Sequence, residues 1–152
     1  MSFFKKLPEL SLENYFSTKV IALGYMSFFY PVKKVKDLRI HFSGKFKNNT
    51  LTLKENYQDN DSEAFRIWYF KKNSTHNYIG KEKSVKGDIN VSLYANKLSM
   101  EYQFRTNYKK IFFNVAVKDN MYLVDKHTLI NKTIISKYGF TIAESFLVYK
   151  KS

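Results

Sequence analysis

The sequence predicts an all-β domain, an antiparallel meander closed into a barrel or a sandwich. Apolar and polar residues alternate with a period of two over most of the chain, which is typical of strands with one wet face. Turn-forming residues recur at short, regular intervals. The two prolines, Pro8 and Pro31, both precede the main run of alternation, so the hydrogen-bonded ladders that follow can be continuous.

The length of 152 residues predicts one domain over 1–152, since a chain of this size can bury a sizeable core. Residues 1–11 form an N-terminal segment with no strand pattern. A helix is expected only over 11–16, where SLEN offers a helix-capping pattern.

The strands that follow are short and alternate clearly. The pattern predicts strands over 50–57, 65–70 and 97–106, and in the last of these Leu98, Met100, Tyr102 and Phe104 share one face. Turn signals separate the strands; they lie at Asn48-Asn49, 58–63, 71–77, Lys86-Gly87-Asp88, Ala95-Asn96, Thr106-Asn107, Lys118-Asp119-Asn120 and Tyr138-Gly139.

The last third of the chain predicts two closing strands. After a turn at 118–120, residues 121–124 form a short strand, 124–128 its turn, and 129–136 the next strand. Asp125 and Asn131 are expected to hydrogen-bond neighbouring backbone and so fix the strand register. Gly139 supplies a turn conformation that other residues resist.

Glu55 and Arg66 are the first candidate site residues. Glu55 shares a strand face with apolar residues, and a carboxylate buried on that face needs a partner. Arg66, on the same face as Trp68 in the next strand, is the expected partner. The pair either fixes strand pairing only, or anchors a polar group of a ligand in an apolar pocket.

Signals for catalysis or a cofactor are weak. The chain has no cysteine, its three histidines lie far apart, and no nucleophile elbow or Gly-rich phosphate loop occurs. No metal and no cofactor are therefore expected. Glu144 shares a face with Ile142, Phe146 and Val148 in the pattern and is a second inward carboxylate, so acid–base chemistry with Glu55 stays open.

The net charge of +13 admits two kinds of partner. A basic surface with many aromatic residues suits nucleic acid or an anionic membrane. The lysines are scattered along the chain, however, and compositional drift is the favoured explanation for them. Five aromatic residues could form a base-stacking platform, although core packing is the more frequent role; they are Trp68, Tyr69, Phe70, Tyr102 and Phe104.

Several short motifs resemble those of a known family. The order NMYLVD, LINK and KYGFTIAE, preceded by TLTLKENY, RIW and LSMEYQF, resembles the bacterial domain-of-unknown-function family 3833, whose members are described as lipoproteins. The resemblance extends from about Leu12 to the end. It implies a lipocalin-like (calycin-like) barrel with an apolar ligand or a role beside fatty-acid modification.

The resemblance also nominates residues. Positions matching the family motifs are Glu55, Arg66, Trp68, Asp119, Met121, Tyr122, Asp125, Asn131, Lys137, Gly139 and Glu144. We expect Glu55, Arg66, Trp68, Tyr102, Phe104, Tyr122 and Glu144 to contact a ligand, and the remaining matches to be structural. The chain departs from the family at Lys118, Asn120, Lys132 and Ala143, and it lacks the lipidated cysteine.

The sequence thus predicts a β-barrel that binds an apolar or amphipathic, lipid-derived ligand and does not catalyse a reaction. Peripheral contact with an anionic membrane is a further expectation. A nucleic-acid-binding barrel is the alternative, disfavoured here, and an isomerase- or hydratase-like enzyme of lipid metabolism is the second alternative. The chain shows no signal peptide, lipobox cysteine or spanning apolar run, so a cytoplasmic location is expected.

Overall fold

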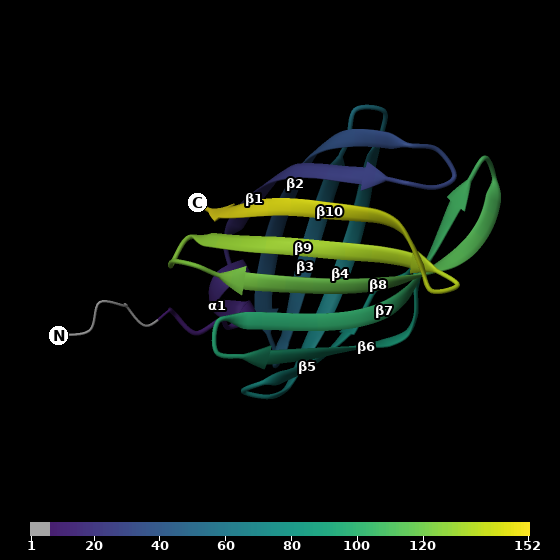
Figure 1. The fold of residues 1–152 in the computed structure, drawn as a ribbon. Helices are drawn as coiled ribbons and strands as arrows, with labels where there is room; N and C mark the ends of the chain where they lie inside the picture. Colours follow the sequence, from purple (N-terminus) through teal and green to yellow (C-terminus); the bar gives the residue numbers. More distant parts are fainter. Residues whose placement is uncertain (1–6) are drawn as a thin grey trace.

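The structure, a computed structural model, describes residues 7–152 and shows a closed antiparallel β-barrel with one short helix (Figure 1). The predicted all-β barrel is confirmed; the part of the predicted N-terminal segment at 1–6 lies outside the described residues. Ten strands follow α1 (Leu12–Phe16); they are β1 (Lys19–Phe28), β2 (Lys34–Lys47), β3 (Thr50–Gln58), β4 (Glu63–Ser74), β5 (Asn77–Lys81), β6 (Val85–Tyr94), β7 (Lys97–Tyr108), β8 (Ile111–Leu123), β9 (Thr128–Lys137) and β10 (Phe140–Lys151).

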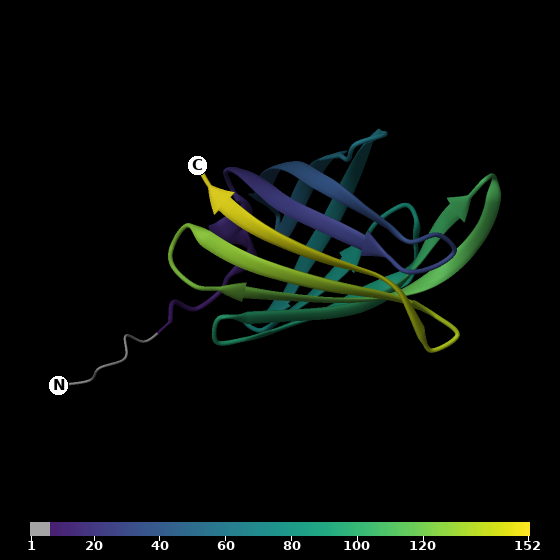
Figure 2. The same cartoon turned by 45° about the horizontal axis from the view of Figure 1, so that its top comes forward.

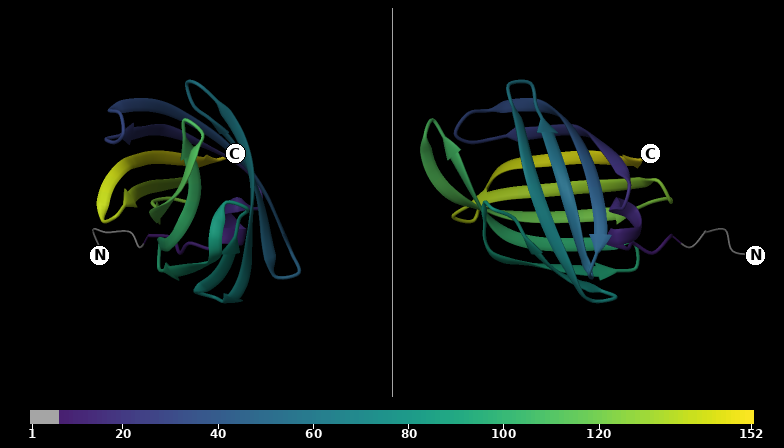
Figure 3. Two further views of the ribbon diagram at one scale, coloured as in Figure 1. Left: turned by 90° about the vertical axis from the view of Figure 1, so that its right-hand side faces the viewer. Right: turned by 180° about the vertical axis from the view of Figure 1, so that it is seen from behind.

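Each strand pairs with its neighbour in sequence, and β1 also pairs with β10, which closes the barrel. Ala22 is buried between Ile40 of β2 and Tyr149 of β10 at this seam. The strands of β2–β4 cross those of β7–β10 steeply when the barrel is seen from behind (Figure 3). The alternating burial along each strand places one set of side chains inside the barrel.

The helix α1 closes one end of the barrel. Phe16 is 1% exposed and packs edge-on against Phe42 and Tyr149 at ring distances of 5.8 and 6.1 Å. The hydroxyl of Tyr15 donates to the carbonyl of His127 at 2.9 Å, so the helix is fixed to the loop between β8 and β9. We call this the plugged end.

Glu13 fixes α1 to the opposite side of the barrel wall. Its carboxylate accepts hydrogen bonds from Lys72 of β4, at 2.7 Å, and from the hydroxyl of Tyr78 of β5. Burial alone would raise the pKa of Glu13, but the hydrogen bonds from Lys72, Tyr78 and Ser11 outweigh burial and hold that pKa below its ordinary value.

The opposite end of the barrel is open. Five connections lie around it: 29–33, 59–62, 82–84, 109–110 and 138–139. The β7–β8 hairpin extends beyond the other connections, as the tilted view shows (Figure 2).

Three predicted turns are wrong. Residues 86–88 lie inside β6, where the pairing with β7 shifts register between Lys86 and Asn90. Residues 118–120 lie inside β8, because Asp119 points into the barrel and is hydrogen-bonded there. Residues 106–107 lie inside β7, which turns instead at Lys109-Lys110. The helix, expected over 11–16, begins at Leu12, and the turn at Tyr138-Gly139 is present with φ of 51° and 80°.

A candidate ligand-binding cavity

The barrel encloses a cavity of about 1120 Å³ that reaches from α1 to the open end. Leu12 and Phe16 form its floor, and the residues before and after the open-end loops form its mouth. Most of the wall is apolar and aromatic, which is typical of sites for small organic ligands. Four of the predicted aromatic residues line it, namely Trp68, Phe70, Tyr102 and Phe104.

The predicted contact between Glu55 and Arg66 is present. The two residues are cross-strand partners on β3 and β4, and Nη1 of Arg66 lies 3.3 Å from Oε2 of Glu55. The guanidinium group also lies over two rings, 5.1 Å from the centroid of Phe104 and 5.6 Å from that of Tyr57. The carboxylate and the two aromatic rings all attract the guanidinium group, so three contacts fix the position of Arg66 in the barrel wall.

Burial governs the titration of Glu55. Its side chain is 10% exposed, and burial raises the pKa of Glu55 while the Arg66 guanidinium opposes that rise. The Arg66 side chain stays 28% exposed to the space inside. Arg66 can therefore offer hydrogen-bond donors to a ligand without breaking its contact with Glu55.

A second polar group lies on β8 and β9, nearer the plugged end. Asn131 donates one hydrogen bond to Asp119 and another to the carbonyl of Asn120, at 3.1 Å. The hydroxyl of Thr133 donates to Oδ1 of Asp119 at 3.3 Å. Ser145, on the neighbouring β10, is buried and lines the same part of the wall.

Asp119 is a buried carboxyl group with no cation in contact among the described residues. Burial raises the pKa of Asp119 to about 6, against the hydrogen bonds from Asn131 and Thr133, and the charge of Glu55 adds to the rise. Near neutral pH this group exchanges a proton easily, so it can accept a hydrogen bond from a ligand or give up a proton to one.

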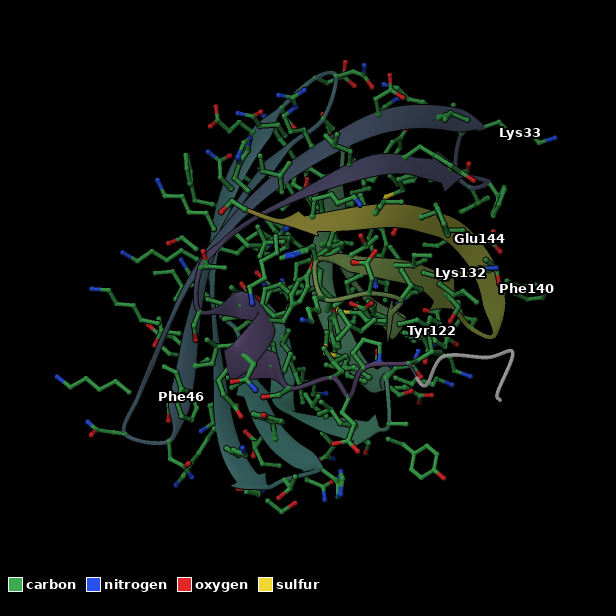
Figure 4. The ribbon with its side chains drawn as sticks, turned by 90° about the vertical axis from the view of Figure 1, so that its left-hand side faces the viewer. Lys33, Phe46, Tyr122, Lys132, Phe140 and Glu144 are labelled. Atoms are coloured by element: carbon green, nitrogen blue, oxygen red, sulfur yellow. The ribbon has the colours of Figure 1, made fainter. Side chains whose placement is uncertain are left out.

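Two residues expected at the site lie outside it. Glu144 and Tyr122 do not line the cavity, and both lie on the outer side of the barrel wall (Figure 4). The inward residues of β10 are Ala143, Ser145, Leu147 and Tyr149, opposite in parity to the prediction. The ring of Tyr122 lies under the ammonium group of Lys97, 5.5 Å away.

Comparison with known proteins assigns the chain to a family. A family model matches residues 1–151. The chain belongs to the family described as "Protein of unknown function (DUF3833)". The resemblance drawn from its motifs is thereby confirmed. No curated protein sequence matches it.

A solved structure shares the fold of this DUF3833 chain. The S-type phycobiliprotein lyase CPES from Guillardia theta matches with a TM-score of 0.66 and 7% sequence identity, over 94% of this chain and 93% of that one. At this identity the likeness concerns the fold alone, which it identifies as lipocalin-like.

The family motifs of the DUF3833 chain divide between the cavity and the turns. Asp119, Met121, Asn131 and Lys137 line the cavity, although they were expected to be structural. Asp125, in contrast, accepts hydrogen bonds from the backbone N–H groups of His127 and Thr128, as predicted for a turn.

The sequence reasoning missed other cavity residues. Thr133 and Ser145 drew no attention, because short hydroxyl residues in strands carry no sequence signal of their own. The pairing of β8 with β9 brings Asp119 opposite Thr133, and the pairing of β9 with β10 brings Thr133 opposite Ser145. Parity with Met121 would have placed Asp119 on the inner face of β8, and parity with Leu129 would have placed Asn131 on the inner face of β9.

Within residues 7–152 no cluster of three or more His, Asp or Glu side chains could hold a metal ion. No helix among these residues is long and apolar enough to cross a membrane.

Proposed function

We propose that this DUF3833 barrel binds one amphipathic, lipid-derived molecule in its cavity. The observation that carries the proposal is an apolar cavity of about 1120 Å³, open at one end, with polar groups at two depths. That volume is at the upper end for small-molecule sites. The space therefore suits a ligand with a long chain or several rings.

The two polar groups support an amphipathic rather than a purely apolar ligand. Arg66, with Glu55, can bind an acidic or carbonyl group of the ligand in the middle of the barrel. Asp119, deeper inside, can accept a hydrogen bond from an O–H or N–H group. A hydrocarbon would leave Asp119 without a partner beyond Asn131 and Thr133, at a cost in free energy.

The first experiment is native mass spectrometry of the purified protein. We expect a one-to-one adduct that solvent extraction identifies, or, from a delipidated protein, a one-to-one adduct with added oleic acid. A protein that stays empty in both conditions would contradict the proposal.

A matched pair of variants locates the bound molecule. Ala143→Phe places a ring inside the cavity and should abolish the adduct, because Ala143 lines the wall. Ala116→Phe places the same ring on the outer face of β8 and should leave the adduct unchanged. Equal uptake by the two variants would show that oleic acid binds elsewhere.

A second candidate function, acid–base catalysis on the bound molecule, is favoured by the pKa of Asp119. Two carboxyl groups, Asp119 and Glu55, face one cavity, and burial raises the pKa of both. This is the arrangement that general acid–base chemistry near neutral pH needs. Chromatography of the ligand after incubation would show conversion by the native protein and none by Asp119→Asn. An unchanged ligand would exclude this function for that molecule.

The nucleic-acid alternative has less support. Of the five aromatic residues considered for base stacking, Trp68, Phe70, Tyr102 and Phe104 line the cavity, and Tyr69 is exposed. Nucleic-acid bases stack on aromatic rings that a single-stranded nucleic acid can reach. The rings inside this barrel, which α1 closes at one end, are not accessible in that way.

A further inference from the structure

Exposed apolar side chains gather at the open end of the barrel. Six of them, two in or directly after each of three connections, are more than half exposed; they are Tyr30, Val32, Ile111, Phe112, Tyr138 and Phe140. We call this set the rim. Large exposed apolar patches often mark sites where a protein meets another protein or a membrane. Figure 4 shows Phe140 at the outer edge of the barrel, and Lys33 projecting from the tip of the β1–β2 loop.

The tip of the β7–β8 hairpin combines apolar and cationic residues. It reads Tyr108-Lys109-Lys110-Ile111-Phe112, and no acidic residue occurs between Glu101 and Asp119. The cations lie against the rings: Arg105 lies 5.0 Å from the centroid of Phe112, and Lys109 lies 5.4 Å from that of Tyr108. Aromatic rings and lysine side chains of this kind suit the boundary between lipid headgroups and acyl chains.

The turn itself carries a cost. Lys109 and Lys110 have φ of 49° and 69°. This is the two-residue hairpin turn in which Asn-Gly is the least strained pair, and lysine is disfavoured at both positions. Neither ammonium group forms an ion pair with a described residue. Two lysines thus occupy strained positions, and neither has an ion pair among the described residues; the contact of Lys109 with the ring of Tyr108 lies within the same hairpin.

The opposite side of the open end is electrically neutralised. Asp59 and Asp61 of the β3–β4 loop form ion pairs with Lys34 and Lys36, at 2.7 to 3.3 Å. Apart from Lys33 at the tip of the β1–β2 loop, Lys34 and Lys36 on this side are therefore paired, whereas Lys109 and Lys110, beside Ile111 and Phe112, form no ion pair with a described residue.

We propose that the rim binds the surface of an anionic bilayer, so that the mouth of the cavity faces the membrane. The lysines of the β7–β8 turn contact the lipid headgroups, and the rim side chains enter the interfacial layer. Aliphatic side chains such as Val32 and Ile111 favour a bilayer over nucleic acid, because they bury in lipid but offer no face for stacking. The proposal goes beyond ligand binding and can be tested with an empty cavity.

Vesicle co-sedimentation tests the rim directly. The delipidated protein should bind vesicles of three parts phosphatidylglycerol to seven parts phosphatidylcholine, and binding should fall as NaCl rises from 50 to 300 mM. Phosphatidylcholine vesicles should bind far less. Absence of binding, or equal binding to both kinds of vesicle, would overturn the proposal.

The decisive variant is the double substitution K109N/K110G. It installs the least strained turn, so the thermal midpoint should stay level or rise, while vesicle affinity should fall tenfold or more because two headgroup contacts are lost. The control K45Q/K47Q removes the same charge from exposed positions on β2 near the plugged end. Equal losses in the two variants would show that overall charge, and not the rim, drives binding.

A second variant tests the apolar part of the rim. Phe112→Ser should weaken vesicle binding while a control at the other end, Phe46→Ser, leaves it unchanged (Figure 4 shows Phe46 at the β2–β3 turn). Displacement of the vesicles by a single-stranded oligonucleotide would overturn the proposal in favour of nucleic acid. Uptake of oleic acid without vesicles should be equal in all these proteins, which separates failure of docking from failure of the proposed function.

Discussion

Asp119 moves from water to a buried position when the chain folds. In the unfolded chain its carboxyl group is in water, and in the barrel it is buried among Met100, Met121 and Thr133. Two hydrogen bonds partly replace that water, and no described cation does. The native state therefore favours the protonated acid.

Asp119→Asn should remove a pH-dependent loss of stability. Burial raises the pKa of Asp119 from 3.8 to about 6, so between these values the native state binds a proton that the unfolded state has released. The free energy of unfolding then falls as pH rises through this window, by about 3 kcal/mol in all. Asparagine does not ionise, so the variant should be about 3 kcal/mol more stable than the native protein at pH 8. At pH 4 the two should be nearly equal.

Denaturant unfolding at pH 4, 6 and 8 measures this difference. Thr133→Val keeps Asp119 ionisable and serves as the control. An Asp119→Asn advantage of the same size at pH 4 and pH 8 would show that its source is packing and not ionisation.

The Glu55–Arg66 pair should separate stability from ligand binding. Arg66→Met leaves Glu55 buried without its partner and should cost about 3 kcal/mol, whereas E55L/R66M should restore most of that stability but reduce uptake of oleic acid. Glu101 and Lys118 provide the control, because they are cross-strand partners 3.8 Å apart on the outer face. Full uptake by E55L/R66M would assign the inner pair to strand pairing alone.

At the scale of elements, the close packing of α1 against β2 requires a glycine. Gly44 of β2 lies directly under the backbone of α1, and a Cβ added there would overlap the carbonyl oxygen of Phe16. Since that neighbour is backbone, it cannot move out of the way by changing rotamer.

Gly44→Ala should therefore displace α1. We expect a loss of about 1–3 kcal/mol in the free energy of unfolding and faster amide hydrogen exchange over Leu12–Phe16 than in the native protein. The adjacent Ser43→Ala, at an exposed position, should change neither quantity. Unchanged exchange in α1 would mean that the helix tolerates the extra methyl group.

The positions of the strands were largely predictable from the sequence. Which side chains of each strand point into the barrel was not always predictable. In β7 the inner face is apolar and the outer face polar, which leaves one interpretation. In β10 both faces carry apolar residues, because Phe146 packs on the outside 6.5 Å from Tyr25. The larger apolar residues of that strand suggested the wrong face, and Glu144 was placed inside as a result.

At the scale of the whole molecule, the barrel follows from local pattern, but the site follows from pairing. The match between Glu55 and Arg66 was predictable, since their strands are joined by a short loop. The group formed by Asp119, Asn131 and Thr133 was missed although β8 and β9 are also joined by a short loop, 124–127, because polar residues within β8 were taken for a turn. Lys118-Asp119-Asn120 resembled a turn because polar residues inside a barrel mimic polar residues in a loop.

A molecule bound in the cavity should stabilise the entire barrel. Because it binds the native state only, oleic acid at about 100 times its dissociation constant should add roughly 2.7 kcal/mol. For a domain of this size that is a rise of about 5–10 °C in the thermal midpoint. Ala143→Phe should show no such rise. A native protein with the adduct but no rise would indicate attachment outside the cavity.

The position of α1 has a consequence for the kinetics of exchange. A cavity that is closed at one end has a single opening, so a bound ligand must dissociate before the next ligand can enter by the same route. The dissociation rate of the first molecule then limits the uptake of the second, whatever the concentration of the second. Such a barrel releases its ligand only at the open end, and it cannot act as a channel through which molecules pass from one end to the other.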